Sequence, residues 1–191
     1  MRRFRTALIA CGLSVFLSAC GSLLATMQAD TIEDESDERT IAQVIEDDNI
    51  ETKAVVNIHA ADEAFDNAHI VVVSINGYVL LAGQVASEEL KATATDVVRE
   101  VHGVRRIYNE MEIAAPSSGV TRTSDTWITT KVKSWLLGRS DIEGTRVKVV
   151  TENGVVYLMG LATAEEAQRI ADKAASVGGV QRVVRLFEII D

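Results

Sequence analysis

Apolar residues recur with helical spacing between Ser124 and Leu137, in the stretch SDTWITTKVKSWLL. Spacings of i, i+4, i+7 and i+8 place four of them on one stripe: Ile128, Val132, Trp135 and Leu136. A short polar residue, Ser124 or Asp125, is expected to cap the first turn. Trp127 does not belong to the stripe, because at about 100° per residue it lies more than a quarter turn away, beside Lys131. The pattern predicts an amphipathic helix with Trp135 in the core and Trp127 on the polar side.

The chain also contains an internal repeat with a period of 76 to 78 residues. The segment Val71–Leu90 matches Val147–Ala167, and each contains Asn-Gly between two short β-branched runs. Asn-Gly favours a type I′ hairpin turn, because both central positions of that turn have positive φ. A helical segment with two glutamates in its first turn follows each hairpin, and a last strand closes each copy at Arg105–Ile113 or Gln181–Ile190. Each copy therefore has the predicted order helix-strand-strand-helix-strand.

These elements predict an α/β (α+β) fold made of two tandem copies of one small domain. The strand-helix-strand crossover should be right-handed, which gives each copy a mixed three-stranded sheet with both helices on one face. We place the first copy at residues 46–113 and the second at residues 124–191. The segment 114–123 between them contains the only proline of the chain and is predicted to be a linker.

The first 19 residues have the features of a secretory signal peptide. A basic start, MRRFR, precedes an apolar run that is too short for a stable membrane span. The run ends in Leu-Ser-Ala before Cys20, which resembles the recognition pattern of bacterial lipoprotein signal peptides; an ordinary signal peptide or an anchor helix is the alternative. The resemblance implies cleavage before Cys20 and acylation of that residue. Because Gly21 rather than Asp follows, similarity to known sorting rules favours the outer membrane. The mature chain would then have no disulfide, since Cys11 lies in the removed segment.

Charge is distributed unevenly along the chain, whose formal net charge is −9. Asp30–Glu51 has ten acids and one base, residues 52–119 have nine acids and five bases, and residues 120–191 have nine acids and ten bases. Nucleic-acid binding is disfavoured, because phosphate contacts need clustered Lys and Arg. We interpret residues 20–45 as a solvated acidic tether. Helical spacing predicts that the tether ends in a short extra helix containing Ile41, Val44 and Ile45.

Residue patterns typical of enzymes and cofactor sites do not occur in the sequence. The histidines His59, His69 and His102 lie on different predicted elements and lack metal-site spacing. No glycine-rich phosphate loop or G-x-S-x-G motif occurs, and the glutamate pairs lie at helix starts, where the helix dipole stabilises them. We therefore predict a protein that is not an enzyme and binds neither a cofactor nor a metal.

The repeated unit resembles the BON domain, named for bacterial OsmY and nodulation proteins. The resemblance rests on the Asn-Gly hairpin, the LxGxxxxxxE helix start and the closing strand after HGV or GGV. Behind the lipoprotein motif, this arrangement is similar to the dual-BON lipoproteins of proteobacterial outer membranes. That similarity implies binding of anionic phospholipid, such as phosphatidylglycerol or cardiolipin, through the second domain. It also implies attachment to the inner leaflet of the outer membrane facing the periplasm, enrichment at division sites and a role in envelope integrity.

The repeat tests whether the fold itself requires Trp127. Asn49 occupies the equivalent position in the first copy, whereas the core positions stay apolar in both copies. An indole with a lysine beside it suits the headgroup region of a bilayer, where the lysine can pair with phosphate. The predicted phospholipid-binding residues on this helix are Trp127, Lys131, Ser134, Thr130, Thr126 and Leu137.

Two other interpretations of this surface stay open at the level of sequence. Trp127 could pack against the first domain or the linker, which would leave a purely structural tandem protein. The same surface could instead receive an envelope protein, so that the chain is a periplasmic adaptor for division or outer-membrane assembly factors.

Overall fold

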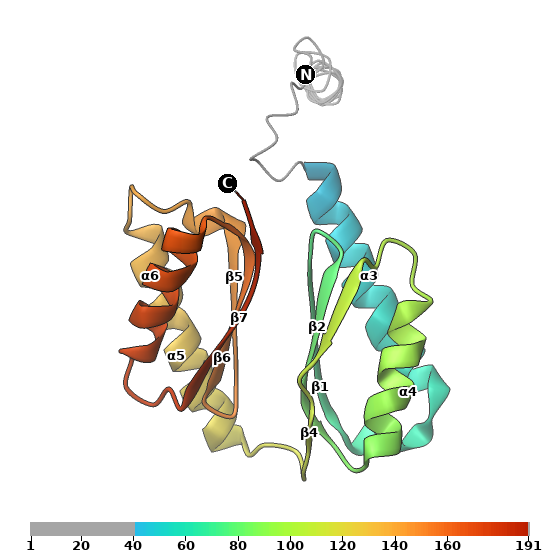
Figure 1. Ribbon diagram of the computed structural model, residues 1–191. Helices are drawn as coiled ribbons and strands as arrows, with labels where there is room; N and C mark the ends of the chain where they lie inside the picture. The colour runs from blue at the N-terminus through green and yellow to red at the C-terminus, as the bar shows by residue number, and fades with distance from the viewer. Residues whose placement is uncertain (1–40, 191) are drawn as a thin grey trace, which may run out of the picture. The chain divides into compact units, whose positions relative to one another are not determined.

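The computed structural model describes residues 41–190, in which each copy of the repeat forms one α+β domain (Figure 1). The elements of the first domain are α3 (Ile41–Ala61), the short 3₁₀ helix η1 (Glu63–Asn67), β1 (His69–Ile75), β2 (Tyr78–Val85), α4 (Glu88–Arg99), β3 (Arg106–Asn109) and β4 (Glu112–Ile113). The elements of the second are α5 (Gly119–Leu137), the 3₁₀ helix η2 (Gly144–Arg146), β5 (Val147–Glu152), β6 (Val155–Ala162), α6 (Ala164–Ala175) and β7 (Arg182–Ile189).

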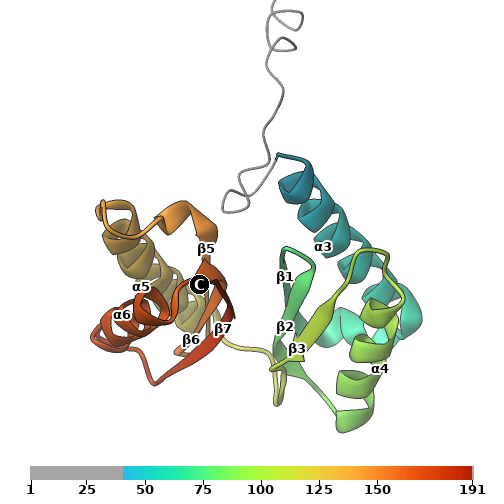
Figure 2. The ribbon, with the colours of Figure 1, turned by 45° about the horizontal axis from the view of Figure 1, so that its top comes forward.

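The two sheets have the predicted mixed topology. In the first domain β2 is central, pairing antiparallel with β1 and parallel with β3 and β4. In the second domain β6 pairs antiparallel with β5 and parallel with β7. Both helices of each domain lie on the same face of its sheet (Figure 1, Figure 2). The predicted fold class is confirmed.

Both Asn-Gly pairs form tight hairpin turns with two consecutive residues in the left-handed region. The φ values are 53° and 73° for Asn76 and Gly77, and 50° and 75° for Asn153 and Gly154. Positive φ at both central positions is the property of the type I′ turn predicted from the sequence. The second strand of each hairpin also contains a glycine with positive φ, Gly83 or Gly160, where a Cβ would collide with the backbone oxygen of His69 in β1 or of Arg146 just before β5.

Three apolar clusters form the core of the described part of the chain. One lies between the helices and the sheet of the first domain and includes Ile50, Ala54 and Ile58 of α3. The second lies between the helices and the sheet of the second domain, with Ile128, Val132 and Leu136 of α5 at the equivalent positions. The third combines residues of β2, such as Leu80, with residues of β6, such as Tyr157. The described part of the chain contains no disulfide. The third cluster gives it a further apolar core between the two sheets.

The structure corrects three details of the sequence prediction. Helix α5 begins at Gly119, capped by Ser118, so neither Ser124 nor Asp125 is its N-cap and part of the predicted linker 114–123 is helical. The predicted short extra helix is instead the first part of the continuous helix α3. The predicted last strand of the first domain is interrupted after Asn109, whose side chain donates to Thr95 Oγ1 and accepts from the backbone N–H of Met111.

Candidate functional site

Helix α5 has one face in the core and one face in solvent. Ile128, Val132 and Leu136 are buried, whereas the side chain of Trp127 is 58% exposed. Trp135 is half-buried against the edge of the core of the second domain, rather than at its centre. The fold thus leaves the indole of Trp127 accessible to a ligand, in keeping with its absence from the apolar stripe of the sequence.

Trp127 and Lys131 lie together on the exposed side of α5. They are four residues apart and therefore neighbours on the helix surface. The Lys131 Nζ atom lies 4.5 Å from the centroid of the indole, within the range of a cation–π interaction. This contact keeps a positive charge against a large apolar ring, so a ligand with an anionic group next to an apolar body would meet both.

The other predicted site residues share this exposed side. Leu137 is 69% exposed, and Thr126, Thr130 and Ser134 are also exposed. The Thr126 hydroxyl donates to the Arg122 carbonyl oxygen and the Thr130 hydroxyl to the Thr126 carbonyl oxygen, both at 2.8 Å. These two hydroxyl protons are used within the helix. Donation to a ligand therefore depends chiefly on Lys131, the indole N–H and Ser134.

One residue of this surface was missed from the sequence. Val120 is 82% exposed and lies seven residues before Trp127, so it falls on the same side of the helix. The sequence reasoning started the helix at Ser124 and so left Val120 in the linker. The signal that could have found it is Ser118, which is followed by a helical run and accepts a hydrogen bond from the Thr121 N–H. We use "α5 surface" below for Val120, Thr126, Trp127, Thr130, Lys131, Ser134 and Leu137.

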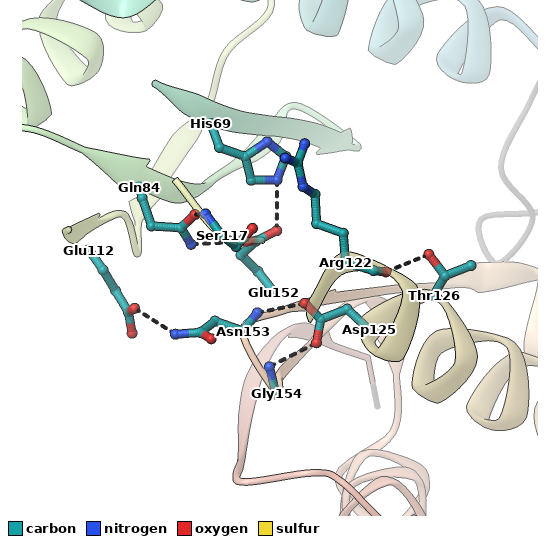
Figure 3. Close-up of polar contacts among 10 residues, drawn as sticks. All are labelled: His69, Gln84, Glu112, Ser117, Arg122, Asp125, Thr126, Glu152, Asn153 and Gly154. Atoms are coloured by element: carbon teal, nitrogen blue, oxygen red, sulfur yellow. Dashed lines mark hydrogen bonds and ion pairs between the residues drawn. The ribbon is translucent and has the colours of Figure 1, made fainter. Parts of the chain in front are cut away.

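The exposed charges of α5 are all positive. The helix contains Arg122, Lys131 and Lys133, which are exposed, and one acid, Asp125, which is buried. Asp125 accepts hydrogen bonds from the backbone N–H groups of Asn153 and Gly154, both at 2.9 Å (Figure 3). Its negative charge is therefore directed at the hairpin turn inside the domain, and the outer side of α5 presents cations.

Asp125 has a counterpart in the first domain at the same place in the repeat. Asp47 accepts hydrogen bonds from the backbone N–H groups of Asn76 at 2.8 Å and Gly77 at 3.0 Å, and from the Ser74 hydroxyl at 2.6 Å. Each first helix thus fastens its own Asn-Gly turn through a buried carboxylate. The sequence carried a signal for this role, since both aspartates stand three residues before the first core isoleucine of their helix.

A third buried carboxylate, Glu152, connects the start of α5 with the first domain. It accepts hydrogen bonds from His69 Nε2 at 3.1 Å, Gln84 Nε2 at 2.9 Å and the Ser117 hydroxyl at 3.2 Å (Figure 3). The donor role of His69 follows from its partner, because a carboxylate accepts. Gln84 Oε1 in turn accepts from the Ser117 backbone N–H at 2.8 Å, next to the N-cap residue Ser118. Glu152 therefore holds the residues from which the helix with the exposed tryptophan begins.

Several other ionisable groups have structural contacts of their own. His59, His69 and His102 each face one acid, at 3.4, 3.1 and 3.6 Å, and within residues 41–190 no group of His, Cys, Asp and Glu could hold a metal ion. Hydrogen bonding from Arg139 lowers the pKa of the exposed Asp141. Burial raises the pKa of Tyr157 to about 12, which suits a phenol in the core between the sheets.

The membrane attachment predicted for Cys20 lies outside the described residues. Within the part of the chain that the structure describes, no helix has the length and apolar character needed to span a bilayer.

Comparison with known proteins gives the family. The BON domain model matches residues 46–115 and 124–191. "Outer membrane lipoprotein DolP" of Haemophilus influenzae is 33% identical over 180 residues, covering 94% of this chain and 93% of that protein. The "21 kDa hemolysin" of Actinobacillus pleuropneumoniae is 35% identical over 155 residues, covering 81% and 79%. "Osmotically-inducible protein Y" of Escherichia coli is 30% identical over 108 residues, covering 55% and 54%.

Among solved structures, the C-terminal domain of CdsD, the structural protein of the type III secretion system of Chlamydia trachomatis, is similar with a TM-score of 0.31 and 13% sequence identity, over 76% of this chain and 67% of that one. This likeness is too weak to add to the sequence relationships. The chain belongs to the BON-domain family and is a DolP-like outer-membrane lipoprotein with two BON domains.

Proposed function

We propose that the protein binds anionic phospholipid through the α5 surface and thereby supports the integrity of the envelope in which it is anchored. The observation that carries the proposal is the exposed Trp127 with Lys131 Nζ 4.5 Å from its ring. An indole prefers the headgroup region, and a lysine near an anionic bilayer contributes roughly 1 kcal/mol of binding free energy. Arg122 and Lys133 are further exposed cations of the same helix, and its acid is buried.

A lipid anchor at Cys20 would complement this surface. Attachment at the inner leaflet of the outer membrane would hold the α5 surface close to headgroups, so a weak site would be occupied through high effective concentration. We place the protein on the periplasmic side, with enrichment at division sites as a further part of the proposal. No step of this function needs a cofactor or a catalytic residue.

Vesicle co-sedimentation tests the proposal with residues 21–191, which carry no acyl chain. We expect binding to vesicles of phosphatidylglycerol or cardiolipin, and roughly tenfold or greater weakening by Trp127→Glu, which removes the indole and adds a charge repelled by the lipid. Asn49→Glu is the matched control, because Asn49 occupies the equivalent position on α3. It should leave binding unchanged.

Indole fluorescence gives an independent readout of the same event. In a Trp135→Phe variant, emission from Trp127 should shift to shorter wavelength on addition of anionic vesicles and stay unchanged with phosphatidylcholine alone. Equal vesicle binding by the wild type and Trp127→Glu would reject the α5 surface as the lipid site. A protein-adaptor role for that surface would then become the leading explanation.

A further inference from the structure

Helix α3 exposes apolar residues at positions where α5 has glycine, threonine or serine. Ile41 is 80% exposed, Ile45 56% and Val56 60%. With Thr52 they occupy positions i, i+4, i+11 and i+15, which share one side of a helix. We call Ile41, Ile45, Thr52 and Val56 the α3 ridge. Since Ile50, Ala54 and Ile58 are buried in the core, α3 has apolar residues on two opposite sides.

The BON fold does not require the α3 ridge to be apolar. The equivalent positions on α5 are Gly119 for Ile41, Thr123 for Ile45 and Ser134 for Val56. Helix α5 nevertheless packs on its sheet in the same way, with Ile128 and Leu136 buried. Exposed apolar residues in a row on a well-packed helix are typical of an interaction surface.

A lipid bilayer is an unsuitable occupant for this ridge. The exposed acids Glu46 and Asp48 lie on the same helix, against one exposed lysine, Lys53. An anionic membrane would repel this side, and α3 contains no aromatic residue for the headgroup region. The composition favours a protein helix with matching apolar and charged positions.

The order of charges along α3 indicates which partner helix would match it. Both exposed acids lie in its N-terminal half and Lys53 lies in its C-terminal half. A second α3 in antiparallel orientation brings the acidic half of one helix to the basic half of the other, whereas a parallel copy brings like charges together. The antiparallel arrangement also places Ile45 opposite Val56 and opposes the two helix dipoles. We propose that the α3 ridge binds the α3 ridge of a second copy of this chain around a two-fold axis.

Such a contact is self-complementary, as a two-fold interface must be. One helix pair is smaller than the interface of a stable soluble dimer, so pairing should be weak in dilute solution. Attachment of many copies to one membrane raises their effective concentration and favours the pair there. The α5 surface stays free in this arrangement, and the inference does not depend on which ligand α5 binds.

Cysteine crosslinking tests the arrangement with residues 21–191, which contain no cysteine. In the antiparallel pair, Ile45 of one copy faces Val56 of the other, whereas the two Ile45 residues are 11 positions apart along the axis, or about 16 Å. A disulfide needs Cα atoms within about 7 Å. Under mild oxidation, a mixture of Ile45→Cys and size-tagged Val56→Cys should therefore form a disulfide-linked mixed dimer. The yield of this mixed dimer should be several-fold higher than the yield of self-linked dimer from either variant alone. The matched control is a mixture of Thr123→Cys and Ser134→Cys, the equivalent positions on α5.

Sedimentation equilibrium at rising concentration gives the second measurement. The wild type should approach twice the monomer mass, and a variant with Ile45→Lys and Val56→Lys should keep the monomer mass, with circular dichroism showing that it is folded. The proposal is overturned if the wild type stays monomeric in solution and the mixture of Ile45→Cys and Val56→Cys crosslinks on vesicles no better than the α5 control. Equal crosslinking of each single variant with itself overturns the antiparallel arrangement.

Discussion

Helices α3 and α5 occupy the same place in two copies of one fold, yet their outer sides differ in chemistry. Inward positions are conserved between the two copies, with Ile50 and Ile128 both 1% exposed. Each helix also has a buried aspartate that fastens an Asn-Gly turn. Outward, α5 presents an indole with cations, whereas α3 presents aliphatic side chains with acids. The difference teaches that packing fixes one side of each helix and leaves the other side free to acquire a separate partner.

The buried aspartates are a feature that α3 and α5 share. Among the substitutions considered, replacing them should have the largest effect, which is on the free energy of unfolding. Asp47→Ala and Asp125→Ala each leave two backbone N–H groups of a tight turn without their carboxylate. We expect a loss of about 2–3 kcal/mol in the free energy of unfolding, because hydrogen bonds to a buried charged group are worth more than neutral ones. Asp47→Ala should lose more, since the Ser74 hydroxyl also loses its acceptor.

Urea unfolding of the variants measures this loss. The matched control is Asp48→Ala, an exposed neighbour on α3, which should change the unfolding free energy by less than about 0.5 kcal/mol. Equal stability of Asp125→Ala and the wild type would show that the aspartates do not fasten the turns.

These aspartates also show where inference from the sequence succeeded and where it stopped. The repeat, the hairpin turns and the mixed sheets could be predicted, because Asn-Gly pairs and β-branched alternation act through local geometry. The sequence interpretation gave the role of helix cap to Ser124 or Asp125, since a short polar residue before an apolar stripe has that role in many helices. The actual role of Asp125 as an acceptor depends on a turn 28 residues away, which periodicity alone does not bring into contact.

The surface chemistry was predictable to a similar extent. The position of Trp127 relative to the apolar stripe indicated an exposed ring, because helical periodicity assigns a side to every residue. Val120 was missed, because the N-terminus of α5 depends on the cap at Ser118 and on several competing polar residues. Glu152 was missed as well, since its three donors come from β1, β2 and the segment before α5.

A graft between the two helices should have the next largest effect. Thr52 and Lys53 of α3 already match Thr130 and Lys131 of α5. Asp48→Thr and Asn49→Trp add the equivalents of Thr126 and Trp127, and Glu46→Ser removes the other exposed acid of α3, which gives a triple variant. In a Trp127→Glu background we expect this graft to restore binding to phosphatidylglycerol vesicles by several-fold, because it adds an indole and removes two acids. Asn49→Trp alone should restore less, since the acids remain.

Co-sedimentation measures the restored binding, and phosphatidylcholine vesicles are the control for nonspecific apolar contact. Failure of the triple variant to bind, with unfolding free energy unchanged, would contradict the idea that an indole, a lysine and the absence of acids are sufficient. The lipid site would then require features outside the shared part of the two helices.

The smallest expected effect concerns the lysine common to both helices. Lys131→Ala removes the cation 4.5 Å from the indole, and it should weaken binding to anionic vesicles roughly fivefold at low salt. Lys53→Ala removes the equivalent charge from α3 and should have no effect, although the change in net charge of the chain is the same. Raising the salt concentration should reduce the difference between wild type and Lys131→Ala, because mobile ions screen an exposed charge. If Lys53→Ala weakens binding as much as Lys131→Ala, the lysines act only through net charge and the pairing of Lys131 with Trp127 has no separate role.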